Sequence, residues 1–454
     1  MPFNVRLLRN TTSLTGVALV TASAVLFLTV FLADLFGLHT NPYIGIVFFL
    51  ILPAIFLLGL VLIPIGAWIN RRRPHPVHAA AHWPRIDLND PIQRRGVFLF
   101  ATLTLANIVI VSLAAYRGIE YMDSVQFCGQ VCHTVMKPEF TAYQDGPHSR
   151  VACVQCHIGA GASWFAKSKV AGTRQVLAVS FHAYSRPIPS PVDNLRPARD
   201  TCEQCHWPEK FHGDKIRRIY EYAEDEKNTE SVTTLQVHVG GGSERLGIAQ
   251  GIHWHMNVAN DVEYIATDDK RQVIPWVRVN DRNGNVREYV AEGTKPEDLA
   301  KGERRRMDCM DCHNRPSHPM AATPERAINE LMARGDVPKT LPFVRRETVK
   351  ALKASYPSQE AADEGISRAL REFYRSQQPD VYISRRQDVE KAVHATAGVY
   401  RRTVFPEMNV QFGTYPNNIG HIDFPGCFRC HDDNHKTKDG TKIGQDCETC
   451  HKIE

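Results

Sequence analysis

The sequence contains no isolated cysteine: all twelve cysteines fall in six short motifs, and each motif ends in Cys-His. Six such dithiols are too many for a thioredoxin-like redox centre, and closely paired cysteines are not the pattern of a disulfide framework. Zinc knuckles use similar pairs, but zinc does not require a histidine directly after each second cysteine. Disulfides and structural zinc are therefore the weaker alternatives.

The order of residues within the motifs indicates a different chemistry. Five motifs have the spacing Cys-x-x-Cys-His, which is the signature of c-type haem attachment, and the first carries one extra residue between its cysteines. In this chemistry the two thiols bond the haem vinyl groups and the histidine reaches the iron. The sequence therefore predicts six covalently bound haem c groups. The motif residues are Cys128, Cys132 and His133; Cys153, Cys156 and His157; Cys202, Cys205 and His206; Cys309, Cys312 and His313; Cys427, Cys430 and His431; and Cys447, Cys450 and His451.

Charged residues are missing from three long stretches near the N-terminus, at 11–33, 43–70 and 96–116. Each stretch reaches the roughly 20 apolar residues that a helix needs to cross a bilayer. The first is longer than a signal-peptide core, which spans about 7–15 residues. We therefore expect a membrane domain over residues 1–116 with three transmembrane helices.

The distribution of positive charge predicts the orientation of these helices. Lys and Arg are absent from 37–42, whereas arginines occur before residue 10 and throughout 71–95. By the positive-inside rule the N-terminus and the 71–95 loop are cytoplasmic. Three crossings then place all six motifs outside the cytoplasm, where haem is attached to paired thiols. We expect a protein of the bacterial inner (cytoplasmic) membrane with its haem domain facing the periplasm.

The formal net charge of +5 does not indicate a nucleic-acid partner. Six haems would bring twelve propionates, so the loaded protein would carry a charge of about −7 if all of them ionise.

Downstream of the membrane domain, motif density and hydrophobic pattern divide the chain. The predicted fold class is mainly α, a multihaem cytochrome c low in secondary structure, with the three N-terminal helices and a small β-rich insert. A strong turn signal, Asn283-Gly284, separates two predicted strands. The expected segments are a three-haem domain at 117–215, the β-rich insert at 216–300, a fourth haem segment at 301–320, a helical insert at 321–400 and a C-terminal two-haem segment at 401–454.

The second axial ligand of each iron decides function, because a second His or Met gives a six-coordinate electron carrier and an open face allows catalysis. The exported part has more histidines than six irons need, which favours bis-histidine haems. Of His253 and His255 we expect one to be a ligand, and a strand would place both on one face. For the first haem three alternatives stay open: His133 binds the iron and Met136 only packs nearby, Met136 replaces this histidine, or one face of the iron is vacant or weakly bound. The candidate histidines are His148, His182, His253, His255, His318, His421 and His435.

Two motif segments resemble a known family. The run from Phe127 to Met136, Phe-Cys-Gly-Gln-Val-Cys-His-Thr-Val-Met, follows a predicted membrane helix, and Pro147-His148 precedes the second motif. Trp164 and the basic stretch 167–169 follow. Over roughly residues 97–210 the chain resembles the NapC/NirT family of membrane-anchored quinol dehydrogenases. The remainder is similar to the longer inner-membrane cytochromes of metal-reducing bacteria, which carry six or seven haems.

This resemblance implies a site where menaquinol reduces the first haem at the membrane face. It implies Met136 as that iron's ligand, Lys167 or Lys169 by the quinol, and Asp145 or Glu139 as the acidic residue. The partners would be the quinol pool in the membrane and a periplasmic cytochrome or reductase as electron acceptor. Self-association into a homo-oligomer remains open. The sequence departs from the family in the longer first motif and in two additional membrane spans.

Two other functions compete with the quinol-oxidising relay. A terminal reductase acting on a small oxyanion needs a haem with an open iron, and the Cys-x-x-Cys-Lys motif of some multihaem nitrite reductases is absent. A redox sensor or assembly anchor would have to signal through the short loop 71–95, which has no recognisable domain.

Overall fold

The computed structural model forms two compact units, Met1–His133 and Thr134–Glu454, and each is described by itself. Several sequence-based expectations fall outside the described residues: the arginines before residue 10, the 37–42 loop, most of the 71–95 loop and Asn283. The described residues are 10–35, 51–72, 87–159, 162–192, 195–207, 210–211, 213–240, 251–256, 261–281 and 284–454.

The first unit consists of three long apolar helices: α1 (Thr11–Leu35), α3 (Leu52–Arg72) and α4 (Pro91–Met122). All three are long and apolar enough to cross a membrane, which agrees with the three predicted spans. The helix α4 begins earlier and ends later than the predicted 96–116, because Asp90 caps its N-terminus by accepting a hydrogen bond from the Ile92 amide. Only the central part of α4 is free of charge.

Small residues allow α1 and α3 to pack closely. A Cβ atom on Gly16 would lie 2.8 Å from the Gly59 carbonyl oxygen, and one on Gly59 would lie 2.8 Å from the Gly16 carbonyl oxygen. The Ser13 hydroxyl donates a hydrogen bond of 3.0 Å to the Ile63 carbonyl. These contacts are typical of helices that associate within a bilayer, where close backbone approach replaces the hydrophobic effect.

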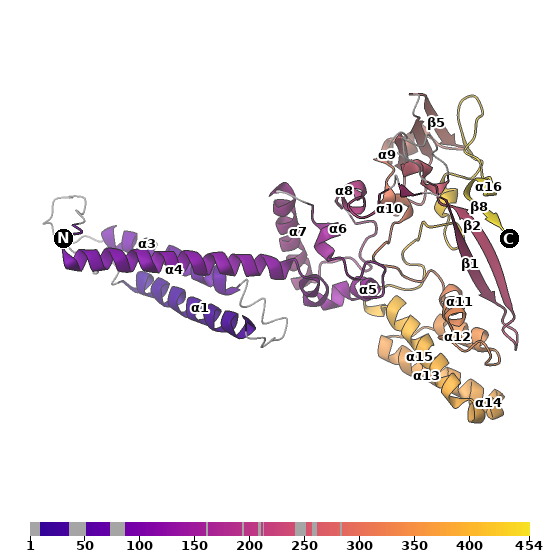
Figure 1. Ribbon diagram of the computed structural model, residues 1–454, viewed down its shortest axis with the longest axis horizontal. Helices are drawn as coiled ribbons and strands as arrows, with labels where there is room; N and C mark the ends of the chain where they lie inside the picture. Colours follow the sequence, from indigo (N-terminus) through magenta and orange to yellow (C-terminus); the bar gives the residue numbers. More distant parts are fainter. Residues whose placement is uncertain are drawn as a thin grey trace. The chain divides into compact units, whose positions relative to one another are not determined.

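The second unit combines short helices near the motifs with two small antiparallel sheets (Figure 1). A three-stranded sheet has the order β1-β2-β8, with strands β1 (Asp214–Tyr222), β2 (Glu230–His238) and β8 (His451–Ile453). A five-stranded sheet has the order β6-β3-β4-β5-β7, with β3 (Asp261–Ala266), β4 (Trp276–Asn280), β5 (Val286–Ala291), β6 (Glu303–Arg306) and β7 (His435–Lys436).

The hairpin predicted on either side of Gly284 is confirmed. Strands β4 and β5 pair antiparallel, and Gly284 has a φ of 75°, which favours glycine. The sheets extend beyond the predicted insert, because β7 and β8 come from the two C-terminal motif segments. The β-rich region therefore joins residues that are 144 or more positions apart in the sequence.

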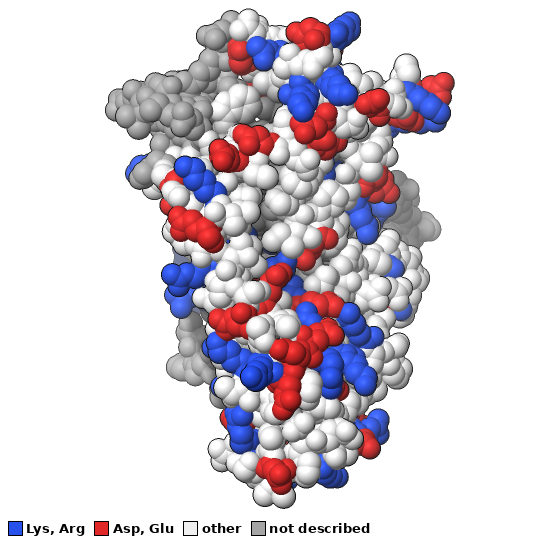
Figure 2. Space-filling view, turned by 90° about the vertical axis from the view of Figure 1, so that its right-hand side faces the viewer, with Lys and Arg blue, Asp and Glu red and all other residues white. Residues whose placement is uncertain are grey.

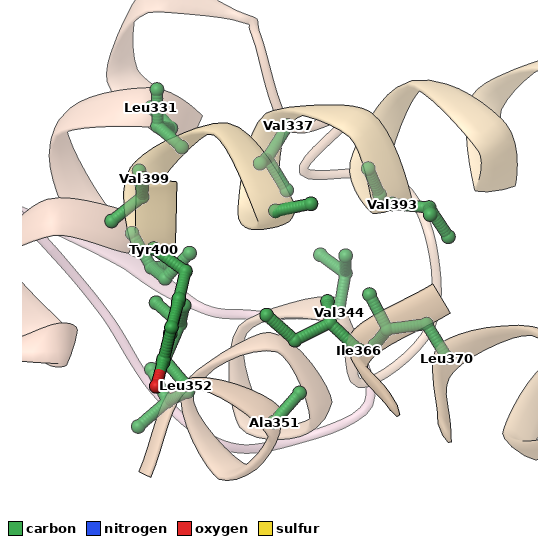
Figure 3. Close-up of a cluster of buried hydrophobic side chains, with 14 of the residues drawn as sticks. Leu331, Val337, Val344, Ala351, Leu352, Ile366, Leu370, Val393, Val399 and Tyr400 are labelled. Atoms are coloured by element: carbon green, nitrogen blue, oxygen red, sulfur yellow. The ribbon is translucent and has the colours of Figure 1, made fainter. Parts of the chain in front are cut away.

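A separate helical core lies between the fourth and fifth motifs. Its helices are α11 (Pro324–Arg334), α12 (Val344–Lys353), α13 (Gln359–Gln377), α14 (Pro379–Ser384) and α15 (Arg386–Thr403). Thr323 caps α11, because its side chain accepts a hydrogen bond from the Arg326 amide. Fully buried Ile328, Val344 and Ile366 belong to one hydrophobic cluster, much of which Figure 3 shows.

The helical core is tied to the three-stranded sheet. The buried Asn228 amide, in the turn between β1 and β2, donates to the Lys339 and Leu341 carbonyls, and its oxygen accepts from the Arg345 amide. Figure 2 shows basic and acidic side chains intermingled on one face of the molecule, without a large area of one sign. The fold class predicted from the sequence is confirmed.

Candidate haem sites

The motif cysteines lie on short turns that bring each Cys-Cys-His group to one side of the chain. The His206, His313 and His431 amides each donate to the carbonyl of the first cysteine of their motif, at 2.8, 2.8 and 3.0 Å. The turns are α6 (Cys153–His157), α8 (Ala198–Cys202), α10 (Cys309–Cys312), η8 (Gly426–Arg429) and α16 (Cys447–Cys450). None of the twelve cysteines forms a disulfide.

The first motif has a different turn. Residues Phe127–Val131 form a π-helix, η3, and Cys132 ends it. A π-helix is wider than an α-helix, so it takes up the extra residue between Cys128 and Cys132. The longer motif is therefore accommodated locally, without an insertion loop. The side chain of His133 lies outside the described residues.

In the second unit, every motif histidine faces one histidine from outside the motifs. An imidazole nitrogen lies about 2 Å from a metal that it binds, and its ring centroid roughly 1 Å further, so two axial imidazoles on one metal have centroids about 6 Å apart. The observed distances match this value. The pairs are His157–His318 at 6.3 Å, His206–His148 at 6.0 Å, His313–His253 at 6.4 Å, His431–His255 at 5.8 Å and His451–His421 at 6.1 Å.

Hydrogen bonds orient the non-motif rings. The Nδ1 atoms of His148, His253, His255 and His318 lie 2.9–3.0 Å from backbone carbonyl oxygens. A donor bond from Nδ1 leaves Nε2 as the metal-binding nitrogen, which is the usual arrangement around a histidine ligand. Burial also lowers the pKa of His157, His255 and His313, and this favours the neutral imidazole that a metal requires.

One cavity connects four of these five pairs, all except His157–His318. Its volume is about 2510 Å³, well above the roughly 300–1,000 Å³ of ordinary small-molecule pockets, and cysteines of the second to sixth motifs line it. The thiols, the facing imidazoles and the size of the cavity all fit several haem c groups. Among the described residues no group of three or more His, Cys, Asp or Glu side chains is arranged to hold a metal ion by itself.

Three of the facing histidines lie next to one motif in the sequence and face the histidine of another motif. His148, just before the second motif, faces the third, and His318, just after the fourth motif, faces the second. His421, just before the fifth motif, faces the sixth. His253 and His255 lie on one 3-10 turn, η6 (Ile252–Met256), and face the fourth and fifth motifs. The five sites are therefore neighbours in one cluster.

This arrangement differs from the sequence-based expectations in two places. Residues 252–256 form a 3-10 turn and not a strand, so His253 and His255 reach two different motifs, where we expected one ligand between them. His435 is buried, and its ring nitrogens lie 2.8 Å from Asp432 Oδ1 and 2.6 Å from the Ile274 carbonyl oxygen. Neither nitrogen is available for iron in this conformation.

The remaining candidates for the first haem and the quinol site occupy separate elements. Met136 is half-buried on α5 (His133–Gln144), and His182 is exposed with a φ of 54°, just after α7 (Ala162–Ser180). On α7, Lys167 is exposed and places its ammonium 5.0 Å from the centre of the Trp164 ring, while Lys169 is half-buried.

The two acidic candidates have different surroundings. Glu139 is largely buried and accepts a hydrogen bond of 2.8 Å from Arg315, and its backbone carbonyl lies 2.9 Å from Nδ1 of His318. Asp145 is more exposed and lies 3.4 Å from Arg402 at the wall of the cavity. Glu139 thus holds a histidine ligand candidate in place, whereas Asp145 is accessible to protons.

Comparison with known proteins decides the family. Residues 91–187 match the N-terminal region of the NapC/NirT cytochrome c family. Over 449 residues the chain is 42% identical to the cytochrome c-type protein ImcH of Geobacter sulfurreducens, covering 98% of this chain and 88% of that protein. The chain belongs to the NapC/NirT cytochrome c family. It is thus a membrane-anchored multihaem cytochrome of electron transport. No solved structure matches it.

Proposed function

We propose that this NapC/NirT cytochrome oxidises quinol, in particular menaquinol, and delivers the electrons to a periplasmic cytochrome or reductase through six covalently bound haem c groups. Haem c, when bound at these motifs, supplies one-electron redox chemistry. The chain provides the thiols that attach it, the imidazoles that face it and the membrane anchor that brings it to the quinol pool.

The pairing of histidines carries this proposal. Each of the five motif histidines in the second unit has a second imidazole at the distance expected for two ligands on one iron. An iron with two imidazole ligands has no position left for a substrate, and such sites serve electron transfer. A terminal reductase needs an open iron, so at these five sites the geometry favours the relay.

Helix α7 supports a quinol-binding role at a membrane surface. Its Val170, Val176 and Leu177 are exposed, as is Phe181 directly after it, and the same helix carries the basic Lys167. Exposed apolar residues together with cations are typical of helices that lie in the interface of a bilayer. The positive charges around the predicted spans support a periplasmic haem domain on the inner membrane.

Quinol oxidation releases two protons, so the site requires a proton acceptor. We assign this role to Asp145 and not to Glu139, because protonating Glu139 would leave the largely buried Arg315 without its counter-charge. Asp145 is more exposed and its ion pair with Arg402 is long, so it can exchange protons at lower cost.

Anaerobic stopped-flow mixing of the purified, haem-loaded protein with a menaquinol analogue tests this function. We expect rapid haem reduction that a quinone-site inhibitor blocks, and a reduction rate at least about tenfold lower in Asp145→Asn with its haem content unchanged. Asp380→Asn, a change at an exposed acid in the helical insert, is the control. A protein that dithionite reduces fully and the quinol does not would contradict the proposal.

A further inference from the structure

The three-stranded sheet aligns two basic residues with the last motif. In one row of the sheet, Lys215 of β1 pairs with Val237 of β2, and Val237 pairs with His451 of β8. In the next row on the same face, Arg217 pairs with Leu235, and Leu235 pairs with Ile453. Residues that pair directly across antiparallel strands point to the same face of the sheet. Lys215 and Arg217 therefore share a face with the motif histidine His451, about 10 Å away across two strand spacings.

This face of the sheet forms part of the cavity wall. Alternate residues of β1, among them Lys215, Arg217 and Ile219, line the cavity, whereas Arg218 points to the opposite face. Helix α16, which carries the cysteines of the sixth motif, packs against β2 of the same sheet. The two basic side chains thus border the volume in which the haem of the sixth motif must lie.

The other basic residues of the cavity wall already have partners. Arg326, Arg334 and Arg402 form ion pairs with Asp423, Asp336 and Asp145. Arg429 donates to the Gly426, Arg271 and Asp311 carbonyls. Within the described part of the wall, Lys215 and Arg217 are the Lys and Arg side chains that form neither an ion pair nor a hydrogen bond. Exposed cations that point into a cavity for anionic cofactors are suited to binding their carboxylates.

We propose that Lys215 and Arg217 bind the propionates of the haem held by the sixth motif and raise its reduction potential. The inference rests on the proposed function, since it requires haem c at Cys447 and Cys450. A guanidinium binds a carboxylate through two parallel hydrogen bonds, and an ammonium adds a point charge. Reduction removes one positive charge from the iron, so nearby cations stabilise the reduced form relative to the oxidised form.

Spectroelectrochemical titration of the haem-loaded, full-length protein tests the assignment. In Arg217→Gln, and in Lys215→Gln, we expect the reduced-to-oxidised ratio of one haem at a fixed potential to fall about threefold to tenfold. Arg217→Lys should retain most of the wild-type ratio. Arg218→Gln is the matched control, because it removes the same charge from the adjacent, equally exposed position on the other face. It should leave all six titrations unchanged.

The affected haem is identified by combining these changes with His421→Met, which alters the ligand facing His451. In that background Arg217→Gln must shift the same component that His421→Met shifts. Loss of this haem alone in Arg217→Gln, restored in Arg217→Lys, would also support the proposal. Unchanged potentials with six haems bound, or equal shifts in Arg217→Gln and Arg218→Gln, would overturn it. Absence of haem from the wild-type peptide that contains Cys447 and Cys450, measured by mass spectrometry, would instead overturn the proposed function itself.

Discussion

The orientation of single imidazole rings determines what the haem sites can do. His421 stacks on Phe428 with centroids 4.1 Å apart and faces His451 with the ring planes 25° apart. His253 faces His313 with nearly parallel planes, whereas His255 and His431 are close to perpendicular. Fixed rings of this kind give each iron a defined ligand field, and the identity of the second ligand then sets its potential.

Replacing His421 by methionine should convert one bis-histidine iron into a His/Met iron. Thioether ligation raises the potential of a c-type haem, so we expect one of the six titrating components to move to a higher potential. Redox titration followed by optical spectroscopy measures this shift. His394→Met, at an exposed histidine of α15, serves as the control and should leave every component in place.

Replacing His435 should lower stability without removing a haem ligand. Its Nε2 lies 2.6 Å from the Ile274 carbonyl oxygen inside the five-stranded sheet region, so His435→Phe should leave that carbonyl without its partner. We expect a loss of stability of about 1–3 kcal/mol with all low-spin haem signals retained, measured by thermal denaturation and by electron paramagnetic resonance. Disappearance of one low-spin signal in this variant would show that His435 is a ligand after all.

The sequence alone does not distinguish the roles of His421 and His435. Both lie within a few residues of a motif, so local spacing treats them alike. The structure separates them through Ile274 and His451, which are distant in sequence from the histidines that they contact. Motif cysteines and motif histidines are predictable because one turn of chain brings them together. Their facing ligands depend on contacts between distant segments, which local spacing in a single sequence does not predict.

At the scale of elements, periodic segments were predictable and short strands were not. The membrane spans and helix α13 carry long hydrophobic or amphipathic patterns, and they occur where these patterns predict. Strands β7 and β8 contain two and three residues and are formed by motif flanks. They exist because the partner strands β5 and β2 offer free edges, so no local pattern marks them.

The hydrophobic cluster of the helical insert should contribute to stability without setting haem potentials. Ile366 on α13 is fully buried in its hydrophobic cluster, and Ile366→Ala removes three methyl or methylene groups from it. We expect a loss of about 2–5 kcal/mol in unfolding free energy, measured by denaturant titration. Arg368→Ala, at an exposed position of the same helix, is the control. Neither Ile366 nor Arg368 lines the haem cavity, so haem potentials should not change in either variant, and a changed potential would contradict this prediction.

At the scale of the whole molecule, the haem-bearing part has little hydrophobic core of its own. Four of the five histidine pairs and nine motif cysteines line a single cavity of about 2510 Å³, and the buried apolar clusters lie beside it. The cofactors themselves must supply the buried apolar surface there. Neighbouring sites share chain segments, as the electron relay that we propose requires.

The most direct test of this account is electron paramagnetic resonance of the oxidised, fully loaded protein, combined with near-infrared magnetic circular dichroism to identify the axial ligands. In two pairs the planes of the facing imidazole rings are 3° and 25° apart, and in two others they are 79° and 89° apart. This difference predicts two classes of low-spin signal from bis-imidazole irons. The account predicts five bis-histidine, low-spin haems, with any high-spin signal confined to one haem. High-spin signals from two or more haems would contradict it.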